Sequence, residues 1–271
     1  MMYSLADSAV EAHAAELLDA YDTGRQLAPI SDGDPAFNAE AAYRIAHKVS
    51  ALREARGERR VGRKIGFTNR TIWPIYGVSG PMWGPVWDST LHEMGERAHR
   101  LPPVPEPRLE PEIAFGLKAA PQAGMTETEL AACIDWVSHG FELVFSPFPK
   151  WRFSGPDSAA AFGLHGALYL GPRMPFTQTI LNQLAHFRIE LEGPGGRRLA
   201  GCGADVLDGP LQALGYLLDT LATDSAAAPV GKGEIVTTGT LTDAVAVSPG
   251  DTWTTRLEGL DLPNASIAFQ S

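Results

Sequence analysis

The sequence predicts an α+β fold with a largely antiparallel or mixed sheet, and the order of its segments carries that prediction. Residues 4–22 and 38–56, at the start of the 271-residue chain, place apolar side chains at helical spacing. Many strand-like segments follow at uneven spacing, and we expect only two later helices, one from Thr126 to Gly140 and one over 209–222. A doubly wound fold would instead alternate strand and helix regularly.

Composition and charge limit the possible functions. The chain is 44% hydrophobic and 20% charged, which is ordinary for a globular protein, and its net charge is -10. Because an acidic chain gains nothing from counterion release, we expect no nucleic-acid partner. No apolar run reaches membrane-spanning length, and the first residues lack the form of a signal peptide. Cys133 and Cys202 lie far apart without metal-site spacing, so we expect reduced thiols in a cytoplasmic protein.

A pair of glutamates is the first candidate site. Glu110 and Glu112 lie two residues apart in a predicted strand, so their side chains point to the same face. If that face is in water, the pair is an ordinary acidic edge. If it is buried, the carboxylates repel each other unless one is protonated or a hard cation such as Mg²⁺ or Mn²⁺ binds. Glu142, inside the apolar strand 141–145, needs a partner and would serve as a third oxygen ligand.

Two more polar residues interrupt apolar strands. Lys64, in the segment 61–68, is either a strand-edge charge in water or a buried amine suited to proton transfer. His165, in the segment 161–171, is either a hydrogen-bonded structural residue or part of a site. The tryptophan-rich stretch 72–90 is expected to line a pocket or to cover a core. No glycine-rich nucleotide motif is present, so a nucleotide cofactor is not indicated.

These motifs follow one another in an order that resembles the 2-keto-4-pentenoate hydratase and 4-oxalocrotonate decarboxylase group of the fumarylacetoacetate hydrolase superfamily. The resemblance covers about residues 40–271 and rests on separated motifs: Lys64 in GRKIGFT, Glu110-x-Glu112, Glu142, and the segments 201–217 and 235–251. It implies a mixed β-roll or sandwich core with an N-terminal helical subdomain. We therefore expect a helical subdomain over residues 1–60 and a β-rich catalytic domain over residues 61–271.

The resemblance also implies a function. It implies a metal-dependent lyase that acts on small 2-oxo or 2-hydroxydienoic acids from the meta-cleavage of aromatic rings, most simply a hydratase. Mg²⁺ or Mn²⁺ would be held by Glu110, Glu112 and Glu142, and the substrate would chelate it through its carboxylate and 2-oxygen. Lys64 would then transfer the proton between the enol and keto forms, and His165 is the next candidate for this acid–base role.

The resemblance further assigns a substrate pocket. Thr238, Gly239 and Thr240 stand where family members hold the substrate carboxylate with hydroxyl and backbone groups. Asp157 keeps the position of a family aspartate, and Phe162 stands at a pocket position.

Three positions depart from the hydratase pattern. Met82 stands where the hydratases commonly have an acidic residue, and Phe162 and Leu164 stand where they commonly have asparagine and serine. These losses leave the reaction open between water addition, decarboxylation, carbon–carbon hydrolysis and tautomerisation. A non-catalytic binder of 2-oxo acids is the remaining alternative, although mere chelation does not need the intact Lys64.

Family members are typically dimers or larger, so the resemblance also implies a homo-oligomer. The tryptophan-rich loop 73–87 and the aromatic segment 145–153 are expected to offer apolar contact surface for it.

Overall fold

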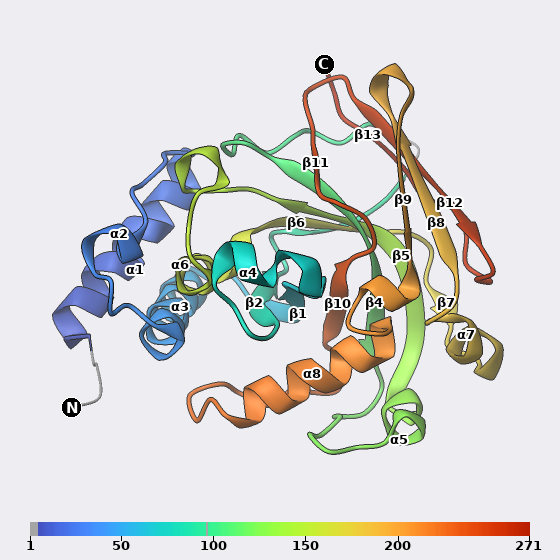
Figure 1. The fold of residues 1–271 in the computed structure, drawn as a ribbon, viewed down its shortest axis with the longest axis horizontal. Coiled ribbons are helices and arrows are strands. Elements are labelled where there is room, and N and C mark those ends of the chain that lie inside the picture. The colour runs from blue at the N-terminus through green and yellow to red at the C-terminus, as the bar shows by residue number, and fades with distance from the viewer. Residues whose placement is uncertain (1–4, 96) are drawn as a thin grey trace.

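A strongly curved mixed sheet forms the centre of the fold in the computed structural model, which describes residues 5–95 and 97–271. The lead helices lie at the left of Figure 1, and a second, smaller sheet stands at its upper right. Within the described residues, nine strands make up the large sheet, with the order β2-β1-β10-β4-β5-β6-β3 and with β11 beside β4 and β7 beside β5. Its strands are β1 (Arg60–Gly66), β2 (Met82–Trp87), β3 (Leu91–Glu93), β4 (Arg108–Leu117), β5 (Ile134–Val144), β6 (His165–Leu170), β7 (Met174–Pro175), β10 (Ile235–Thr240) and β11 (Val245–Ala246).

The large sheet is mixed, as the sequence predicts. The pairs β1–β10 and β3–β6 are parallel, and the pairs β1–β2, β4–β10, β4–β5 and β5–β6 are antiparallel. A parallel pair needs a long connection, and here the chain between β1 and β10 contains most of the molecule. The parallel pair thus places residues 60–66 beside residues 235–240, and β10 in turn lies next to the central strand β4.

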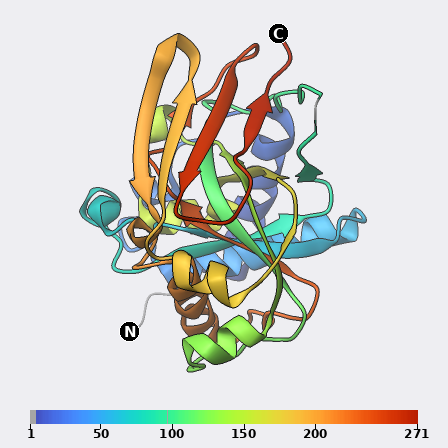
Figure 2. The same cartoon turned by 90° about the vertical axis from the view of Figure 1, so that its right-hand side faces the viewer.

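The smaller sheet packs on the large one and gives the fold its sandwich character, as seen from the side in Figure 2. Leu191 and Trp253 on the small sheet share a buried cluster with Phe141 and Leu143 of β5. Its strands are β8 (Arg188–Gly193), β9 (Arg197–Cys202), β12 (Thr252–Glu258) and β13 (Ser266–Ala268), in the order β13-β12-β8-β9. The α+β fold class with a β-roll or sandwich core is confirmed.

The helices close the remaining faces. The lead helices share a core with Phe145 and Phe148, which follow β5, while the leucines of α8 pack with Phe115 of β4. The helices are α1 (Asp7–Thr23), α2 (Ile30–Gly33), α3 (Ala39–Ala55), α4 (Trp73–Tyr76), α5 (Glu127–Ala132), α6 (Gly155–Ala160), α7 (Gln178–Gln183) and α8 (Pro210–Ala222). The predicted helices at 4–22, 38–56 and 209–222 are confirmed as α1, α3 and α8, except that Ser4 lies outside the described residues. None of the helices in the described part of the chain combines the length and the apolar character that crossing a membrane requires.

The prediction of a helix from Thr126 to Gly140 is wrong in its second half. Thr126 and Glu129 form the expected capping box, but α5 ends at Ala132 and β5 starts at Ile134. The reason is long-range pairing, because β5 lies against β4 from end to end, with Ile134 opposite Leu117. The apolar spacing that suggested a helix instead fills the two buried faces of a central strand.

The two segments expected to offer apolar contact surface turn most of their large side chains inward. Trp83 and Trp87 of the tryptophan-rich loop and Phe145 and Phe148 of the second segment are all buried inside the chain. The large hydrophobic side chains that stand exposed in the described ranges are Ile75, which belongs to the loop 73–87, and Tyr216. The use of these segments as a contact surface stays a prediction.

Candidate metal centre and active-site cavity

Sheet register brings the three predicted glutamates together. Glu110 on β4 lies directly opposite Glu142 on β5, and Glu112 projects from the same face of β4 one step further along. One carboxylate oxygen from each lies within 4.8 Å of the others. Glu112 and Glu142 are buried, and Glu110 borders a cavity. The acidic face is therefore turned into the molecule, and the alternative of an edge strand in water is excluded.

The carboxylate of Glu112 is held on one side only. Its Oε2 accepts hydrogen bonds from the hydroxyl of Thr237 and, at 3.0 Å, from the backbone N–H of Gly239. These donors come from β10, whose register with β4 shifts between Thr237 and Thr240, at the left-handed residue Gly239. The other oxygen, Oε1, is buried and finds no hydrogen-bond partner among the described residues. A buried carboxylate oxygen without a donor is costly, and a cation would satisfy it.

Lys64 lies against this group. Its ammonium nitrogen is 3.2 Å from Oε2 of Glu142, and only 3% of the residue is exposed. Burial lowers the pKa of Lys64, but attraction to Glu142, Glu110 and Glu112 outweighs burial and holds the pKa above its usual value. The alternative of a strand-edge lysine in water is excluded. We call Lys64, Glu110, Glu112 and Glu142 the acidic cluster.

His165 supports the cluster from the neighbouring strand β6. Its Nδ1 lies 2.7 Å from Oε1 of Glu142, and its Nε2 lies 2.8 Å from the hydroxyl of Thr90. Burial and the positive charge of Lys64 hold the pKa of His165 well below its usual value, so the ring is neutral. A neutral ring donates one hydrogen bond to Glu142 and accepts one from Thr90. His165 does not border the cavity, and this geometry makes it a support for Glu142.

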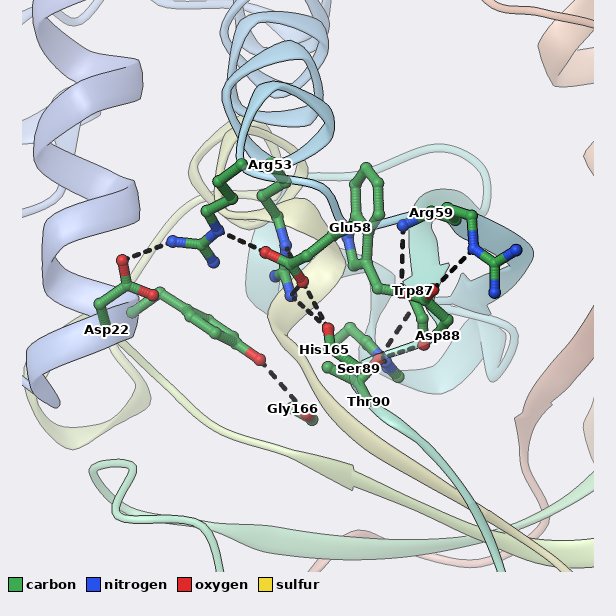
Figure 3. Close-up of polar contacts among 12 residues, drawn as sticks. Asp22, Arg53, Glu58, Arg59, Trp87, Asp88, Ser89, Thr90, His165 and Gly166 are labelled. Atoms are coloured by element: carbon green, nitrogen blue, oxygen red, sulfur yellow. Dashed lines mark hydrogen bonds and ion pairs between the residues drawn. The ribbon is translucent and has the colours of Figure 1, made fainter.

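The contacts of His165 continue outward, as Figure 3 shows. The hydroxyl of Thr90 also accepts a hydrogen bond from the backbone N–H of Trp87 at 3.2 Å. Arg53 lies beside this turn with its guanidinium 5.0 Å from the Trp87 ring, and it pairs with Glu58 at 2.6 Å. The turn between β2 and β3 thus orients the imidazole, and Arg53 of α3 packs against that turn.

The charges of the acidic cluster suit a divalent cation. Burial is the largest cause that raises the pKa of all three glutamates, to about 8 for Glu110, and their mutual repulsion raises the pKa of Glu110 and Glu112 further. When all are ionised, three carboxylates and the ammonium of Lys64 leave two uncompensated negative charges. A divalent cation neutralises that excess, and hard oxygen donors are the ligands that Mg²⁺ and Mn²⁺ prefer. The residues present therefore fit this cofactor.

A cavity of about 540 Å³ opens beside the cluster. Of the residues predicted for the site, Lys64, Glu110 and Thr240 border it directly. Met82 and Leu164, two of the positions that depart from the hydratase pattern, border it as well.

Other predicted pocket residues lie elsewhere. The hydroxyl of Thr238 donates to the backbone carbonyl of Ile113 at 3.0 Å, so it holds β10 to β4. Asp157 is buried and caps helix α6, while it also accepts two hydrogen bonds from Ser31, so it ties α6 to the lead helices. The ring of Phe162 packs against Tyr21 and Phe145 in the lead-helix core. None of these side chains is among the cavity-lining groups of the described residues, and Gly239 acts through its backbone.

Sequence reasoning missed several residues of the site. Thr237 stands next to the predicted triplet, and only the pairing of β10 with β4, with Thr237 opposite Ala114, shows that its hydroxyl faces Glu112. Nothing in the sequence indicates a role for Thr90, because a tight turn between β2 and β3 brings it to His165. Arg108 lies two residues before Glu110 on the same face of β4, so its place beside the cavity follows from the strand period.

The chain resembles characterised enzymes over nearly its whole length. It is 31% identical over 262 residues to 2-hydroxyhexa-2,4-dienoate hydratase of Comamonas testosteroni, covering 96% of this chain and 97% of that enzyme. It is also 31% identical over 262 residues to 2-keto-4-pentenoate hydratase of Burkholderia vietnamiensis, covering 96% and 98%. The chain belongs to the 2-keto-4-pentenoate hydratase and 4-oxalocrotonate decarboxylase group of lyases.

Solved structures show that the fold is shared beyond this hydratase and decarboxylase group. The fold matches 4-oxalocrotonate decarboxylase from Pseudomonas putida G7, solved with magnesium and adipate, with a TM-score of 0.90, 26% identity and coverage of 98% of this chain and 99% of that one. Fumarylpyruvate hydrolase from Pseudomonas aeruginosa, solved with Mn²⁺ and pyruvate, shares the fold at a TM-score of 0.52 and 13% identity, with coverage of 78% and 89%. The core is thus of the fumarylacetoacetate hydrolase type. No protein-family model matches the chain.

Proposed function

We propose that this chain is a divalent-metal-dependent lyase that adds water to small 2-hydroxydienoic acids or their 2-oxo tautomers, in the catabolism of aromatic compounds. One observation carries the proposal. Three carboxylates lie within 4.8 Å of one another, Lys64 lies 3.2 Å from one of them, and both Lys64 and Glu110 border a cavity of about 540 Å³. Membership of a group of hydratases and decarboxylases supports the reaction class.

Glu110, Glu112 and Glu142 would hold Mg²⁺ or Mn²⁺. When bound, the cation supplies a Lewis acid that stabilises negative charge developing on the substrate oxygens. Thr237 and Gly239 fix Glu112, and His165 fixes Glu142, so the three carboxylates are oriented before any ligand arrives.

Lys64 would carry the proton between enol and keto forms. Its Nζ is buried beside Glu142 and Lys64 borders the cavity, so the proton would pass to the substrate without crossing bulk water. The neighbouring carboxylates keep the amine protonated in the resting site. A protonated lysine would donate its proton to the substrate carbon chain and would be reprotonated by the proton that the enol hydroxyl releases.

The carboxylate end of the substrate would lie near Thr240. This residue borders the cavity, and the backbone of Gly239 beside it already donates to Glu112. Apolar side chains make up much of the remaining lining, which keeps water away from the reacting atoms.

The test is a reaction with a matched product analysis. Incubation of the protein and Mg²⁺ with 2-hydroxypenta-2,4-dienoate should remove the ultraviolet absorption of the dienol and yield a 4-hydroxy-2-oxo acid by NMR. Loss of absorption without addition of water would reject hydration, and no spectral change with any 2-oxo or 2-hydroxydienoic acid would favour a non-catalytic binder.

Decarboxylation is the second candidate, because the match to a decarboxylase structure extends over 98% of the chain. The apolar Met82 and Leu164 at the cavity, where hydratases commonly handle water with polar groups, also favour it. Release of CO₂ from a dicarboxylic 2-oxo acid, measured in the same experiment, distinguishes the two.

We also propose that the chain forms a homo-oligomer, on the strength of its family. Light scattering should give a particle larger than the 29.0 kDa of one chain at micromolar concentration. A 29.0 kDa particle would contradict it.

A further inference from the structure

Four aromatic side chains form a continuous lining on part of the cavity, and we call them the aromatic wall. They are Phe67, Tyr76, Trp151 and Phe153. The rings of Tyr76 and Phe153 stack with centroids 4.9 Å apart, and Phe67 meets Tyr76 edge-on at 5.3 Å. Trp151 continues the row, 6.2 Å from Phe153. None of these contacts involves the acidic cluster, so the proposed chemistry does not account for the wall.

The wall is held in place by its backbone. Phe67 and Trp151 have φ angles of 58° and 56°, and Leu164, which also lines the cavity, has 63°. Residues with bulky side chains rarely adopt this left-handed conformation, and it persists only where the surroundings enforce it. Here the indole N–H of Trp73 donates to the carbonyl of Phe67 at 2.7 Å. The left-handed backbone at Phe67 and Trp151 therefore directs their rings toward the cavity.

The cavity is larger than the smallest family substrates require. A five-carbon 2-oxo acid has eight heavy atoms, and at about 30 Å³ for each, the share of a water molecule in the liquid, it would take about 240 Å³. The cavity of about 540 Å³ has more than twice that room. Because Lys64 and Glu110 fix the reacting end of the substrate, the spare volume lies at its remote end.

The larger share of the cavity lining is apolar. Met82 and Leu164 line the cavity together with the wall, and Met82, Trp151 and Phe153 pack on one core cluster. A polar group placed against these side chains would lose water without gaining a partner. Two arginines, Arg108 and Arg197, also border the cavity, and the guanidinium of Arg108 lies over the ring of Trp151, 4.1 Å from the centroid.

We propose that the aromatic wall is a specificity site that binds an apolar substituent, aryl or alkyl, at the end of the substrate remote from its carboxylate. This inference rests on the proposed function for the position of the reacting end. It assigns Tyr76 and Phe153 as the residues that set substrate preference, and it excludes the unsubstituted five-carbon acid and dicarboxylic acids as the preferred ligands.

Binding of stable 2-oxo acids tests the inference without turnover. Calorimetry in the presence of Mg²⁺ would compare 2-oxopentanoate, 2-oxo-5-phenylpentanoate and the dicarboxylate 2-oxoadipate. We expect the phenyl acid to bind at least about tenfold more tightly than 2-oxopentanoate, since pockets discriminate even single methylene groups by about 10- to 200-fold. Equal affinities, tightest binding of the dicarboxylate through Arg108 or Arg197, or no binding by any of the three would overturn it.

Variants then assign the effect to the wall. Tyr76→Ala and Phe153→Ala should each bring the affinity for the phenyl acid close to that for 2-oxopentanoate, while the latter changes by less than about threefold. Ile75→Ala is the matched control, because Ile75 adjoins Tyr76 in the chain but is 73% exposed and lies outside the cavity lining. A full tenfold preference retained in both wall variants would contradict the assignment, and unchanged Mg²⁺ affinity shows that the variants are folded.

The binding and turnover experiments test the specificity site and the proposed reaction separately. If 2-hydroxypenta-2,4-dienoate is hydrated but the phenyl acid gains no affinity, the proposed function stands and this inference is wrong. If the phenyl acid binds tightly through Tyr76 and Phe153 but no dienoic acid is consumed, the specificity site stands and the proposed reaction is wrong.

Discussion

The acidic cluster and the aromatic wall border one cavity but are built in opposite ways. Backbone pairing in a central sheet positions the cluster, so that Glu110 meets Glu142 because β4 and β5 are in register. Loops, the short helices around Tyr76 and Trp151, and left-handed residues such as Phe67 position the wall. The comparison suggests that the sheet carries the chemistry shared by the family, whereas the loops determine which substrate reaches it.

Removal of the Lys64 amine should have the largest effect, because it tests whether the acidic cluster carries the chemistry. Lys64→Met keeps the stem and should lower kcat by about 100- to 10,000-fold, because a general acid–base group is lost. Mg²⁺ binding should be retained, since the three carboxylates remain. Steady-state kinetics and calorimetry check both parts, with the exposed Lys118→Met as the matched control. An unchanged kcat in Lys64→Met would make this lysine structural.

The buried ring of His139 lies in the sheet behind the acidic cluster, and we expect the stability of the fold to depend on its being neutral. Its Nδ1 lies 3.0 Å from the backbone carbonyl of Glu112 and its Nε2 lies 2.8 Å from the hydroxyl of Thr255. Burial lowers the pKa of His139 to about 4. In the unfolded chain this histidine takes up a proton near pH 6.5, whereas in the folded chain it does so only near pH 4. Because the unfolded chain binds more protons between these two values, the free energy of unfolding decreases as the pH falls through this window. The loss approaches about 3 kcal/mol in the free energy of unfolding.

Denaturant unfolding of wild type and His139→Asn between pH 7 and pH 4 measures this effect. The variant keeps a donor toward Glu112 but cannot titrate, so its stability should fall less with decreasing pH. Substitution of the exposed His186 by Asn serves as the control. Identical pH profiles for wild type and His139→Asn would reject the account.

His165→Gln tests whether the residues behind the acidic cluster help to hold its carboxylates in place. The change removes the imidazole that orients Glu142, and losses of about 10- to 100-fold in metal affinity are typical for such supports. Thr90→Val leaves the contact between His165 and Glu142 in place and should have a smaller effect, although it removes the hydrogen bond to His165 and the bonds of the hydroxyl to the backbone of Trp87. Calorimetry with Mg²⁺ measures both, and undiminished affinity in His165→Gln would show that the carboxylates hold their positions unaided.

The same contrast explains what could be predicted from the sequence. The α+β class, the lead helices and the glutamate triad follow from residue spacing and from a family resemblance with separated motifs. The boundary between α5 and β5 does not, because pairing of Ile134 with Leu117 decides it. The inward role of Thr237 depends on the pairing of β10 with β4, and the turn of Phe162 toward the lead helices depends on a left-handed backbone. The division at residue 60, the oligomeric state and the cytoplasmic location stay predictions.

The central claim is that Glu110, Glu112 and Glu142 bind one divalent cation, and a calorimetric titration with Mg²⁺ tests it most directly. Wild type should bind one Mg²⁺ per chain and melt at a higher temperature with the metal, because the cation relieves repulsion among buried carboxylates. The double variant Glu110→Gln, Glu112→Gln should show neither effect. Tight binding of one Mg²⁺ that persists in the double variant, or no binding by wild type, would contradict the account.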